Sequence, residues 1–400
     1  VVAKNLSSGE RKDVSAGVKP FFTADGYLVF GSMEGQILAA PFDPSTLELA
    51  GPAVPLVEGV RVDSDRWPFY SLSLTGDLVY WTGASSAGAE ARVVRVARDG
   101  EVKPIDPEWI FDPGASERAL SLSPDGSRIA VKRLTEAGED IWVKQLDDGP
   151  FSRLTFDPEA DWRPWWSPDG EWVYFISWRG GDLDLYRKRA DGTGGPEVIL
   201  DQDGHVAEAQ LTPDGQWMIL RLGGSTGGLG LRDLAGMNVG AGDSTLVPLA
   251  AEPYDEAEAA ISPDGRWLAY KSTETGRDEI YIRPFPEVDA GKWQISTQGA
   301  YNPVWAHSGR ELFYVRNDGD MVVAELSFDR GVEVVRRTEL FDTGELGLYA
   351  ISNYAGWSVD LDDEHVIMMQ STSTGGGTEA NRFVMVRNWI EEIRDRVKTQ

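Results

Sequence analysis

The stretch Trp165-Trp166-Ser167-Pro168-Asp169-Gly170-Glu171-Trp172-Val173-Tyr174-Phe175 decides the fold of this chain. Its centre is a turn, in which Pro168 presets φ for the first corner, the Asp169 side chain bonds back onto the backbone and Gly170 supplies a positive φ. Aromatic and β-branched residues, which favour strands, stand on both sides of the turn. The stretch therefore predicts two antiparallel strands joined by a tight hairpin.

The same turn recurs along the whole chain. The clean copies are Ser123-Pro124-Asp125-Gly126, Ser167-Pro168-Asp169-Gly170, Thr212-Pro213-Asp214-Gly215 and Ser262-Pro263-Asp264-Gly265. The degenerate copies are Thr23-Ala24-Asp25-Gly26, Ser73-Leu74-Thr75-Gly76, Ala306-His307-Ser308-Gly309 and Asp360-Leu361-Asp362-Asp363. The fourth positions of these copies are 44 to 54 residues apart, which is typical of propeller blades.

Two more strands follow the hairpin in most repeats. A third strand is predicted at segments such as Asp140-Ile141-Trp142-Val143, and a fourth at segments such as Ser152-Arg153-Leu154-Thr155. This pattern predicts an all-β fold, a β-propeller of about eight four-stranded blades, with seven blades as the alternative. Trp166 and Trp305, which come just before their turns, are expected to fill the gaps between blades.

The ends of the chain suggest how the ring closes. We expect one propeller domain over residues 1–400, whose last repeat stops at its third strand, Arg382-Phe383-Val384-Met385-Val386. Residues 1–15 form an orphan hairpin that we expect to complete the last blade, because closure hides an exposed strand edge. An open ring is the competing interpretation. The spacing of Trp389, Ile393 and Val397 predicts a short amphipathic helix over residues 388–400.

Composition limits the classes of partner. The 400 residues include 65 acidic and 38 basic side chains, which give a net charge of −27. This balance argues against nucleic acid or an anionic membrane as partner, because phosphates would be repelled. The absence of cysteine excludes disulfides, thiolate metal sites and cysteine nucleophiles. No apolar run is long enough for a membrane helix, so we expect no membrane insertion by this chain.

Several segments carry a family resemblance: Leu154-Thr155-Phe156-Asp157-Pro158, Trp165-Trp166-Ser167-Pro168-Asp169-Gly170, Leu185-Tyr186-Arg187-Lys188-Arg189-Ala190-Asp191-Gly192 and Ile282-Arg283-Pro284-Phe285-Pro286. They resemble the TolB-like, WD40-like propeller, and more narrowly the version found C-terminal to the catalytic domain in many bacterial serine/threonine kinases. The resemblance implies an extracytoplasmic sensor or scaffold, in the periplasm or at the cell surface, and it supplies no catalytic residues. A cytoplasmic location stays open.

Candidate chemical motifs have simpler explanations. Gly223-Gly224-Ser225-Thr226-Gly227 matches the G-x-S-x-G nucleophile elbow but lies in a Gly-rich connection with no helix after it, so we interpret it as a loop. His205, His307 and His365 fall on opposite rims of the expected propeller, too far apart to share a metal. The acidic clusters at residues 255–258 and 360–364 leave Ca²⁺ open as a ligand, although a solvated acidic surface is the preferred interpretation. No cofactor is expected.

A propeller would bind a ligand in its central funnel, which is lined by the loops that lead into each first strand. By register, these loops contain Arg66, Trp67, Trp162, Arg163, Glu208, Glu258, Tyr301, Asn302 and Tyr354. Aromatic, arginine and carboxylate groups around one mouth suit a protein, peptide or glycan ligand, and they are equally compatible with a water-filled channel. We expect a monomeric, non-catalytic binding module, and the alternatives are a propeller hydrolase or lyase with its site in the funnel, and a structural scaffold.

Overall fold

The structure is a computed structural model of the 400-residue chain. It describes all residues except 5–8, 10, 33–34, 63–67, 74, 83–89, 115–118, 147–148, 202–204, 224–231, 241, 243–244, 351–353, 373–381 and 398–400. The chain divides into two compact units. The first comprises Val1–Ala89, Gly114–Ser116 and Ser373–Gln400, and the second comprises Glu90–Pro113 and Glu117–Thr372.

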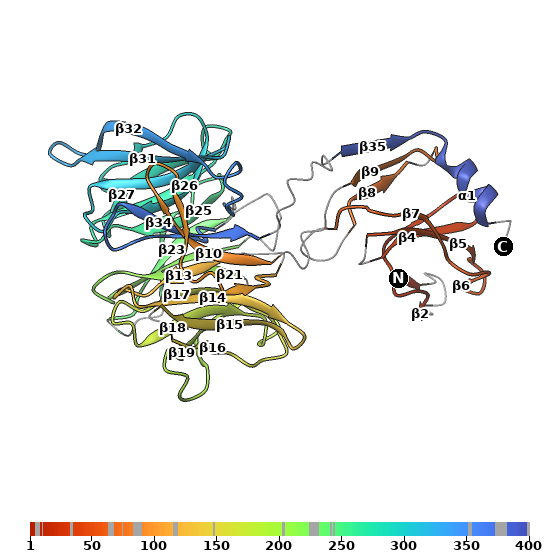
Figure 1. Cartoon of the computed structure of the whole chain (residues 1–400), viewed down its shortest axis with the longest axis horizontal. Coiled ribbons are helices and arrows are strands. Elements are labelled where there is room, and N and C mark those ends of the chain that lie inside the picture. The colour runs from red at the N-terminus through yellow and green to blue at the C-terminus, as the bar shows by residue number, and fades with distance from the viewer. Residues whose placement is uncertain are drawn as a thin grey trace. The chain divides into compact units, whose positions relative to one another are not determined.

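The described residues of the second unit form six antiparallel sheets (Figure 1). Five of them each consist of four consecutive strands. These are β13 (Leu120–Leu122), β14 (Arg128–Thr135), β15 (Gly138–Gln145) and β16 (Phe151–Arg153); β17 (Asp161–Trp166), β18 (Trp172–Ser177), β19 (Asp184–Arg189) and β20 (Glu197–Leu200); β21 (Val206–Leu211), β22 (Trp217–Leu222), β23 (Asp233–Asn238) and β24 (Leu246–Ala250); β25 (Glu256–Ile261), β26 (Trp267–Ser272), β27 (Glu279–Pro284) and β28 (Trp293–Gln294), with the 3-10 helix η1 (Val288–Ala290) between the last two; and β29 (Ala300–Trp305), β30 (Glu311–Arg316), β31 (Asp320–Ser327) and β32 (Glu333–Asp342).

The sixth sheet joins two distant parts of the chain. It contains β33 (Ser358–Val359) and β34 (His365–Ser371) together with β10 (Ala91–Ala97), β11 (Val102–Pro104) and β12 (Ile110–Phe111). β33 contacts both β29 and β13, and each of the other first strands contacts a neighbouring sheet, so the ring is closed. The expected β-propeller is therefore present in this unit.

The first unit contains the remaining described strands. β1 (Val2–Lys4) pairs with β2 (Arg11–Asp13). β3 (Val18–Phe22), β4 (Tyr27–Gly31), β5 (Ile37–Asp43), β6 (Glu48–Leu49) and β7 (Val54–Val57) form one sheet, and β8 (Tyr70–Leu72), β9 (Leu78–Thr82) and β35 (Arg382–Val386) form another. The helix expected over residues 388–400 forms as α1 (Trp389–Val397), and it buries Trp389, Ile393 and Val397 in the core of this unit.

The hairpin turns form as the motif predicts. All eight copies lie between two paired strands of one sheet. In a clean copy the Gly126 amide donates to the Ser123 carbonyl at 2.8 Å, the Ser123 hydroxyl donates to Asp125 at 2.6 Å, and Gly126 has a φ of 71°. The hydroxyl bond of Ser123 lowers the pKa of Asp125 to about 2. The turn chemistry thus sets the position of every hairpin, independently of the unit to which it belongs.

Two expectations about the architecture are corrected. The first two repeats belong to the first unit, so the second unit has six sheets where eight blades, or alternatively seven, were expected in a single domain over residues 1–400. The closing strand is β10, which pairs with β34 from Ala91↔Ser371 to Ala97↔His365. The described strands within residues 1–15, β1 and β2, pair with each other and do not complete the last blade. The reason is burial: β10 contributes the fully buried Val93, Val94 and Val96, whereas β1 and β2 are too polar to be covered on both faces.

The third strands of the second and the eighth repeat are exchanged. β9 is followed along the chain by β10 but pairs with β35, and β34 is followed by β35 but pairs with β10. Each unit is therefore completed by a strand from a distant part of the sequence.

The aromatic residues before the turns fill the interfaces between sheets, as expected. Trp166 and Trp305 are buried, and their indole N–H groups donate to the Ser121 and Ala260 carbonyls in the preceding sheet at 2.9 and 3.0 Å.

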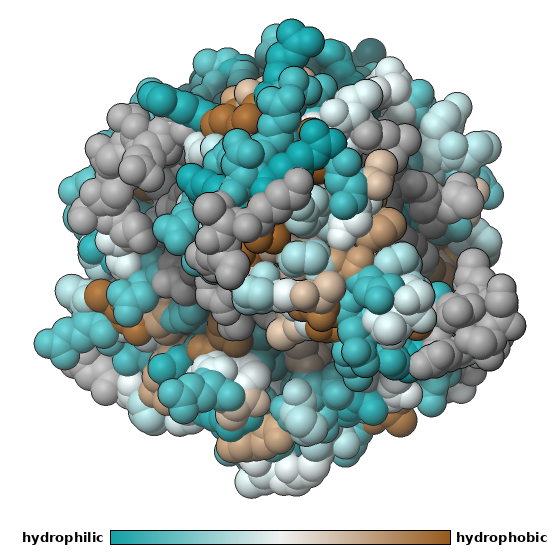
Figure 2. Space-filling view, turned by 90° about the vertical axis from the view of Figure 1, so that its right-hand side faces the viewer, coloured by the Kyte–Doolittle hydropathy of each residue, from teal (hydrophilic) through white to brown (hydrophobic). Residues whose placement is uncertain are grey.

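The two units differ in charge. The first contains 11 basic and 14 acidic residues, and the second 27 and 51. Figure 2 shows one side of the surface, where hydrophilic residues predominate and apolar residues occur in small groups.

Candidate functional site

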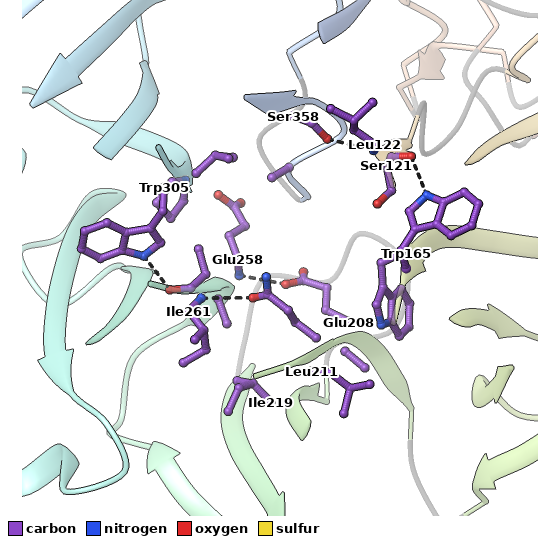
Figure 3. A pocket seen from close by; sticks show the side chains of 18 of the residues that line it. Ser121, Leu122, Trp165, Glu208, Leu211, Ile219, Glu258, Ile261, Trp305 and Ser358 are labelled. Atoms are coloured by element: carbon purple, nitrogen blue, oxygen red, sulfur yellow. Dashed lines mark hydrogen bonds between the residues drawn. The ribbon is translucent and has the colours of Figure 1, made fainter. Parts of the chain in front are cut away.

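A central channel runs between the first strands of the propeller. Its cavity has a volume of about 490 Å³ and is lined by residues from all six sheets (Figure 3). Trp165, Leu211, Ile261 and Val304 belong to its wall, and Pro124, Pro168, Pro213 and Pro263 of the turn motifs line it as well. Two polar links cross between neighbouring inner strands: the Leu122 amide donates to the Ser358 hydroxyl at 3.2 Å, and the Ile261 amide donates to Gln210 at 3.1 Å.

Four of these inner strands each contain a β-bulge near their start, and the bulge changes the direction in which one residue points. The pairing register shifts between Trp162 and Trp165, between Val206 and Glu208, between Ala257 and Ala260, and between Tyr301 and Val304. Within three of the bulges Arg163, Glu258 and Asn302 have φ values of 51°, 58° and 56°, a conformation that non-glycine residues rarely adopt. Together with Glu208, each lies seven residues before the fourth position of its turn motif, so the repeat places them at one level of the ring.

These four residues form a buried polar network. Arg163, Glu208, Glu258 and Asn302 are all less than 8% exposed. Glu208 accepts the Glu258 backbone N–H at 2.9 Å, Glu258 accepts the Asn302 backbone N–H at 2.5 Å, and Arg163 donates to the Ala207 carbonyl. Each link joins one sheet to the next, so the network ties successive blades together near one end of the channel.

Basic side chains neutralise the two carboxylates of this network. Arg221 Nε lies 2.7 Å from Glu208 Oε1, and Lys271 Nζ lies 2.5 Å from Glu258 Oε1. Burial raises the pKa of Glu258 to about 6, although Lys271 opposes the shift. The pairing agrees with the rule that buried charges need partners.

The other funnel residues predicted from the sequence are distributed less uniformly. Tyr354 lines the cavity, and its ring centre lies 5.2 Å from Arg163 Cζ. The Trp162 indole N–H donates to the Glu139 carboxylate at 2.6 Å. Burial raises the pKa of the Tyr301 hydroxyl to about 12. Arg66 and Trp67 lie outside the described residues. Of the seven predicted residues that the structure describes, Glu208, Glu258 and Tyr354 line the cavity directly.

Sequence reasoning missed the wall of the channel. The missed residues, such as Leu122, Leu211 and Ile261, stand four positions before the fourth residue of their motifs, on the motif side of the predicted loops. Leu211 and Ile261 stand three residues after Glu208 and Glu258, and alternation along a strand puts such an odd offset on the opposite face, so the count that located the carboxylates does not reach the wall. The signal that could have found these residues is their place in the motif, because each is the apolar residue directly before the Ser or Thr of its turn.

One acidic cluster differs from expectation. Asp255, Glu256 and Glu258 are buried, so the solvated surface expected at residues 255–258 is wrong. Asp255 pairs with Arg232 at 3.0 Å, and burial raises the pKa of Glu256 to about 8 with help from the nearby Glu252. The segment leads into the inner strand β25 of the propeller, so its side chains are buried despite their charge.

The metal candidates remain separate in the part of the chain that the structure describes, where no three His, Asp or Glu side chains are placed to hold an ion. His307 Nδ1 lies 3.1 Å from Asp363, His365 Nδ1 lies 2.8 Å from Asp362, and the His205 ring packs against Trp178. Most of the G-x-S-x-G loop lies outside the described residues. Among the described helices, none has the length and apolar character to cross a membrane.

Comparisons with known proteins give the same fold. The family model described as the TolB beta propeller domain matches residues 113–238. An uncharacterized protein of Agrobacterium fabrum is 37% identical over 71 residues, which are 18% of this chain and 24% of that protein. The uncharacterized peptidase YuxL of Bacillus subtilis is 27% identical over 194 residues, covering 39% of this chain and 29% of the peptidase.

A solved structure from Agrobacterium tumefaciens, assigned as TolB, is similar with a TM-score of 0.51 and 19% identity, covering 72% of this chain and 99% of that chain. This chain spans less than a third of the length of the two curated relatives. The repeated turn, the closed ring of sheets and these likenesses together identify a TolB-like β-propeller in this chain.

Proposed function

We propose that the propeller is a non-catalytic binding module whose central channel takes an extended segment of a protein partner. The channel wall carries this proposal. It encloses about 490 Å³, and most of its side chains are apolar or aromatic, with a few polar groups from the inner strands. Cavities of this size and composition are typical of binding sites.

The charges beside the channel favour an uncharged ligand segment. Glu208 is paired with Arg221, and Glu258 with Lys271, so neither carboxylate has to be neutralised by a ligand. A charged group brought into this channel would lose its hydration without gaining an opposite charge. The same pairing supports binding over catalysis. An acid or base catalyst must gain and lose a proton, and protonation of Glu258 would weaken its hydrogen bond to the Asn302 amide in the next sheet.

Within this proposal the chain is the sensor or scaffold module of a bacterial signalling protein, acts outside the cytoplasm and is monomeric. The resemblance to kinase-linked propellers supports the signalling role, and the net charge of −27 keeps identical copies apart. A reading frame that encodes a kinase domain and a membrane helix together with this chain would support this assignment, and a frame that joins the chain to a cytoplasmic enzyme would contradict it.

The relative named as a peptidase favours a second candidate, a propeller hydrolase or lyase with its site in the funnel. His307 lines the cavity and faces Asp363, and such a His–carboxylate pair is one part of many hydrolytic sites. Turnover of ester, lactone, glycoside or aminoacyl anilide substrates that is lost in His307→Ala would favour this candidate.

The binding proposal is tested by filling the channel. Peptides are selected from a displayed random library on the whole chain, and their affinities are measured for Leu211→Trp, in which a larger side chain occupies the channel. Val198→Trp, on the exposed part of β20, is the matched control. We expect the channel variant to lose at least about tenfold in affinity, as for a central contact, and the control to lose none. Equal binding by both variants would contradict the proposal.

A further inference from the structure

One sheet of the first unit has an open position beside its third strand. In the five sheets of consecutive strands, the third strand lies between the second and the fourth, and in the first unit β5 likewise lies between β4 and β7. β35 pairs with β9 on one side, and no described strand pairs with its other side. Such an edge presents backbone N–H and C=O groups that can pair with an added strand.

Apolar side chains are exposed along this strand. Phe383 is 74% exposed and Met385 is 67% exposed, and residues two apart lie on the same face of a strand. The Phe383 ring stacks on Trp81 with 5.1 Å between centroids, and Phe69 meets Trp81 edge-on at 5.5 Å. Large apolar groups in such an exposed row mark an interaction surface.

The corresponding side chains of a complete sheet are covered. β27 is also a third strand, and counting from the turn glycines matches Phe383 and Met385 to its Tyr281 and Arg283. Tyr281 is 2% exposed and Arg283 is 7% exposed, and Tyr281 packs in a cluster with residues of the preceding sheet. The exposure of Phe383 and Met385 therefore shows that the described residues leave this face of β35 uncovered, and contacts with added side chains would remove that apolar surface from water.

Two arginines flank the strip and indicate the charge of its partner. Arg382 and Arg387 are exposed, and neither forms an ion pair with any described residue. The first unit is nearly neutral, with 11 basic and 14 acidic residues, so these positive ends are not masked by a strongly acidic unit. An antiparallel strand from a second copy would place Arg382 opposite Arg387 at both ends, and like charges in facing positions are destabilising.

We propose that β35 accepts, as a fourth strand, an extended segment of a partner protein that carries apolar side chains at alternate positions and a carboxylate at each end. Main-chain hydrogen bonds to the free edge would supply affinity, Phe383 and Met385 would contact the apolar side chains, and Arg382 and Arg387 would select the acidic ends. This surface does not include the propeller channel, so the proposal for β35 does not depend on the function proposed above.

The test uses the whole chain and two fluorescein-labelled peptides, Glu-Thr-Val-Thr-Val-Glu and Lys-Thr-Val-Thr-Val-Lys, with binding followed by fluorescence anisotropy at low salt. Two exposed ion pairs are worth together about a fivefold preference for the glutamate-ended peptide. The double variant Arg382→Glu/Arg387→Glu is expected to reverse the preference. The charge-matched control Arg310→Glu/Arg330→Glu changes two exposed arginines of the second unit and is expected to keep it.

A second measurement separates edge pairing from simple charge attraction. Amide hydrogen exchange of residues 382–386 should slow when the glutamate-ended peptide is added, and Phe383→Ser/Met385→Thr should weaken both peptides while it preserves the charge preference. No saturable binding, equal binding of the two peptides, or full amide protection of β35 in the free chain would each overturn the proposal. A concentration-dependent dimer that protects β35 would assign the edge to a second copy and would overturn it as well.

Discussion

Glu258 accepts a hydrogen bond at Oε2 from the backbone N–H of Asn302, 2.5 Å away in the next sheet, although both residues are held at positive φ. A positive φ costs a non-glycine residue roughly 1–2 kcal/mol. The bulge that contains Glu258 lets its side chain reach the Asn302 amide in the next sheet, and Glu208 of the preceding sheet accepts the Glu258 amide in the same way. The strain is thus offset by contacts that fix one blade against the next.

Removing the cation that faces Glu258 should destabilise the propeller. In Lys271→Met the fully buried Glu258 carboxylate loses the ammonium group 2.5 Å away, and breaking such a pair costs about 3–5 kcal/mol. Urea unfolding should show this loss, and Lys271→Met/Glu258→Gln should recover part of it. If the single variant were as stable as the parent chain, the network would have no structural role.

The pH dependence of stability should contain a contribution from Glu256. Its pKa of about 8 in the folded chain lies above the value of 4.5 for an unperturbed glutamate, so the folded state retains a proton that the unfolded state releases. Stability from this residue is therefore complete below about pH 4.5 and is lost as the pH rises toward 8.

Glu256→Gln should remove that pH dependence, because an amide stays neutral. Relative to the parent chain, we expect the variant to gain about 2–4 kcal/mol at pH 8 and little at pH 5, measured by chemical unfolding at the two values. A difference between the variant and the parent chain that is the same at both pH values would contradict the assignment of the shift to Glu256.

The turn motif makes a prediction about backbone strain. Gly215 has a φ of 68° and open space around its Cα, so Gly215→Ala should cost about 1–2 kcal/mol through the backbone alone. Gly195 is equally open but lacks a positive φ, and Gly195→Ala should be neutral or slightly stabilising. Thermal unfolding of the two variants compares them directly, and equal effects would show that the turn tolerates a side chain.

Closure of the ring by β10 can be checked against closure by the N-terminal hairpin. Val94 is fully buried and pairs with Met368, so Val94→Ala should destabilise the second unit by about 2–3 kcal/mol. Val2→Ala, in the half-exposed β1, should change stability by less than about 0.5 kcal/mol. Hydrogen exchange of β34 amides reports on closure, and faster exchange in the Val2 variant than in the Val94 variant would reverse this interpretation.

Local chemistry explains why so much of the site could be placed from the sequence. The Pro-Asp-Gly turn fixes where each hairpin begins, and counting seven residues back from Gly170, Gly215, Gly265 and Gly309 reaches Arg163, Glu208, Glu258 and Asn302. The sequence could not show that Glu208 pairs with Arg221 and Glu258 with Lys271 on the second strands, because that depends on bulges that shift the register.

By itself, the sequence determined the eight hairpins, the all-β class and the level of the ring at which the polar residues lie, because turn geometry and strand propensity act over a few neighbouring residues. Only the tertiary structure decided which strands pair across the chain. β10 and β35 both have strand-forming sequences, and β10 joins β34 because its valines are buried there, while β35, with Phe383 and Met385 exposed, joins β9. Pairing between distant segments depends on how much apolar surface each arrangement buries, which no local pattern encodes.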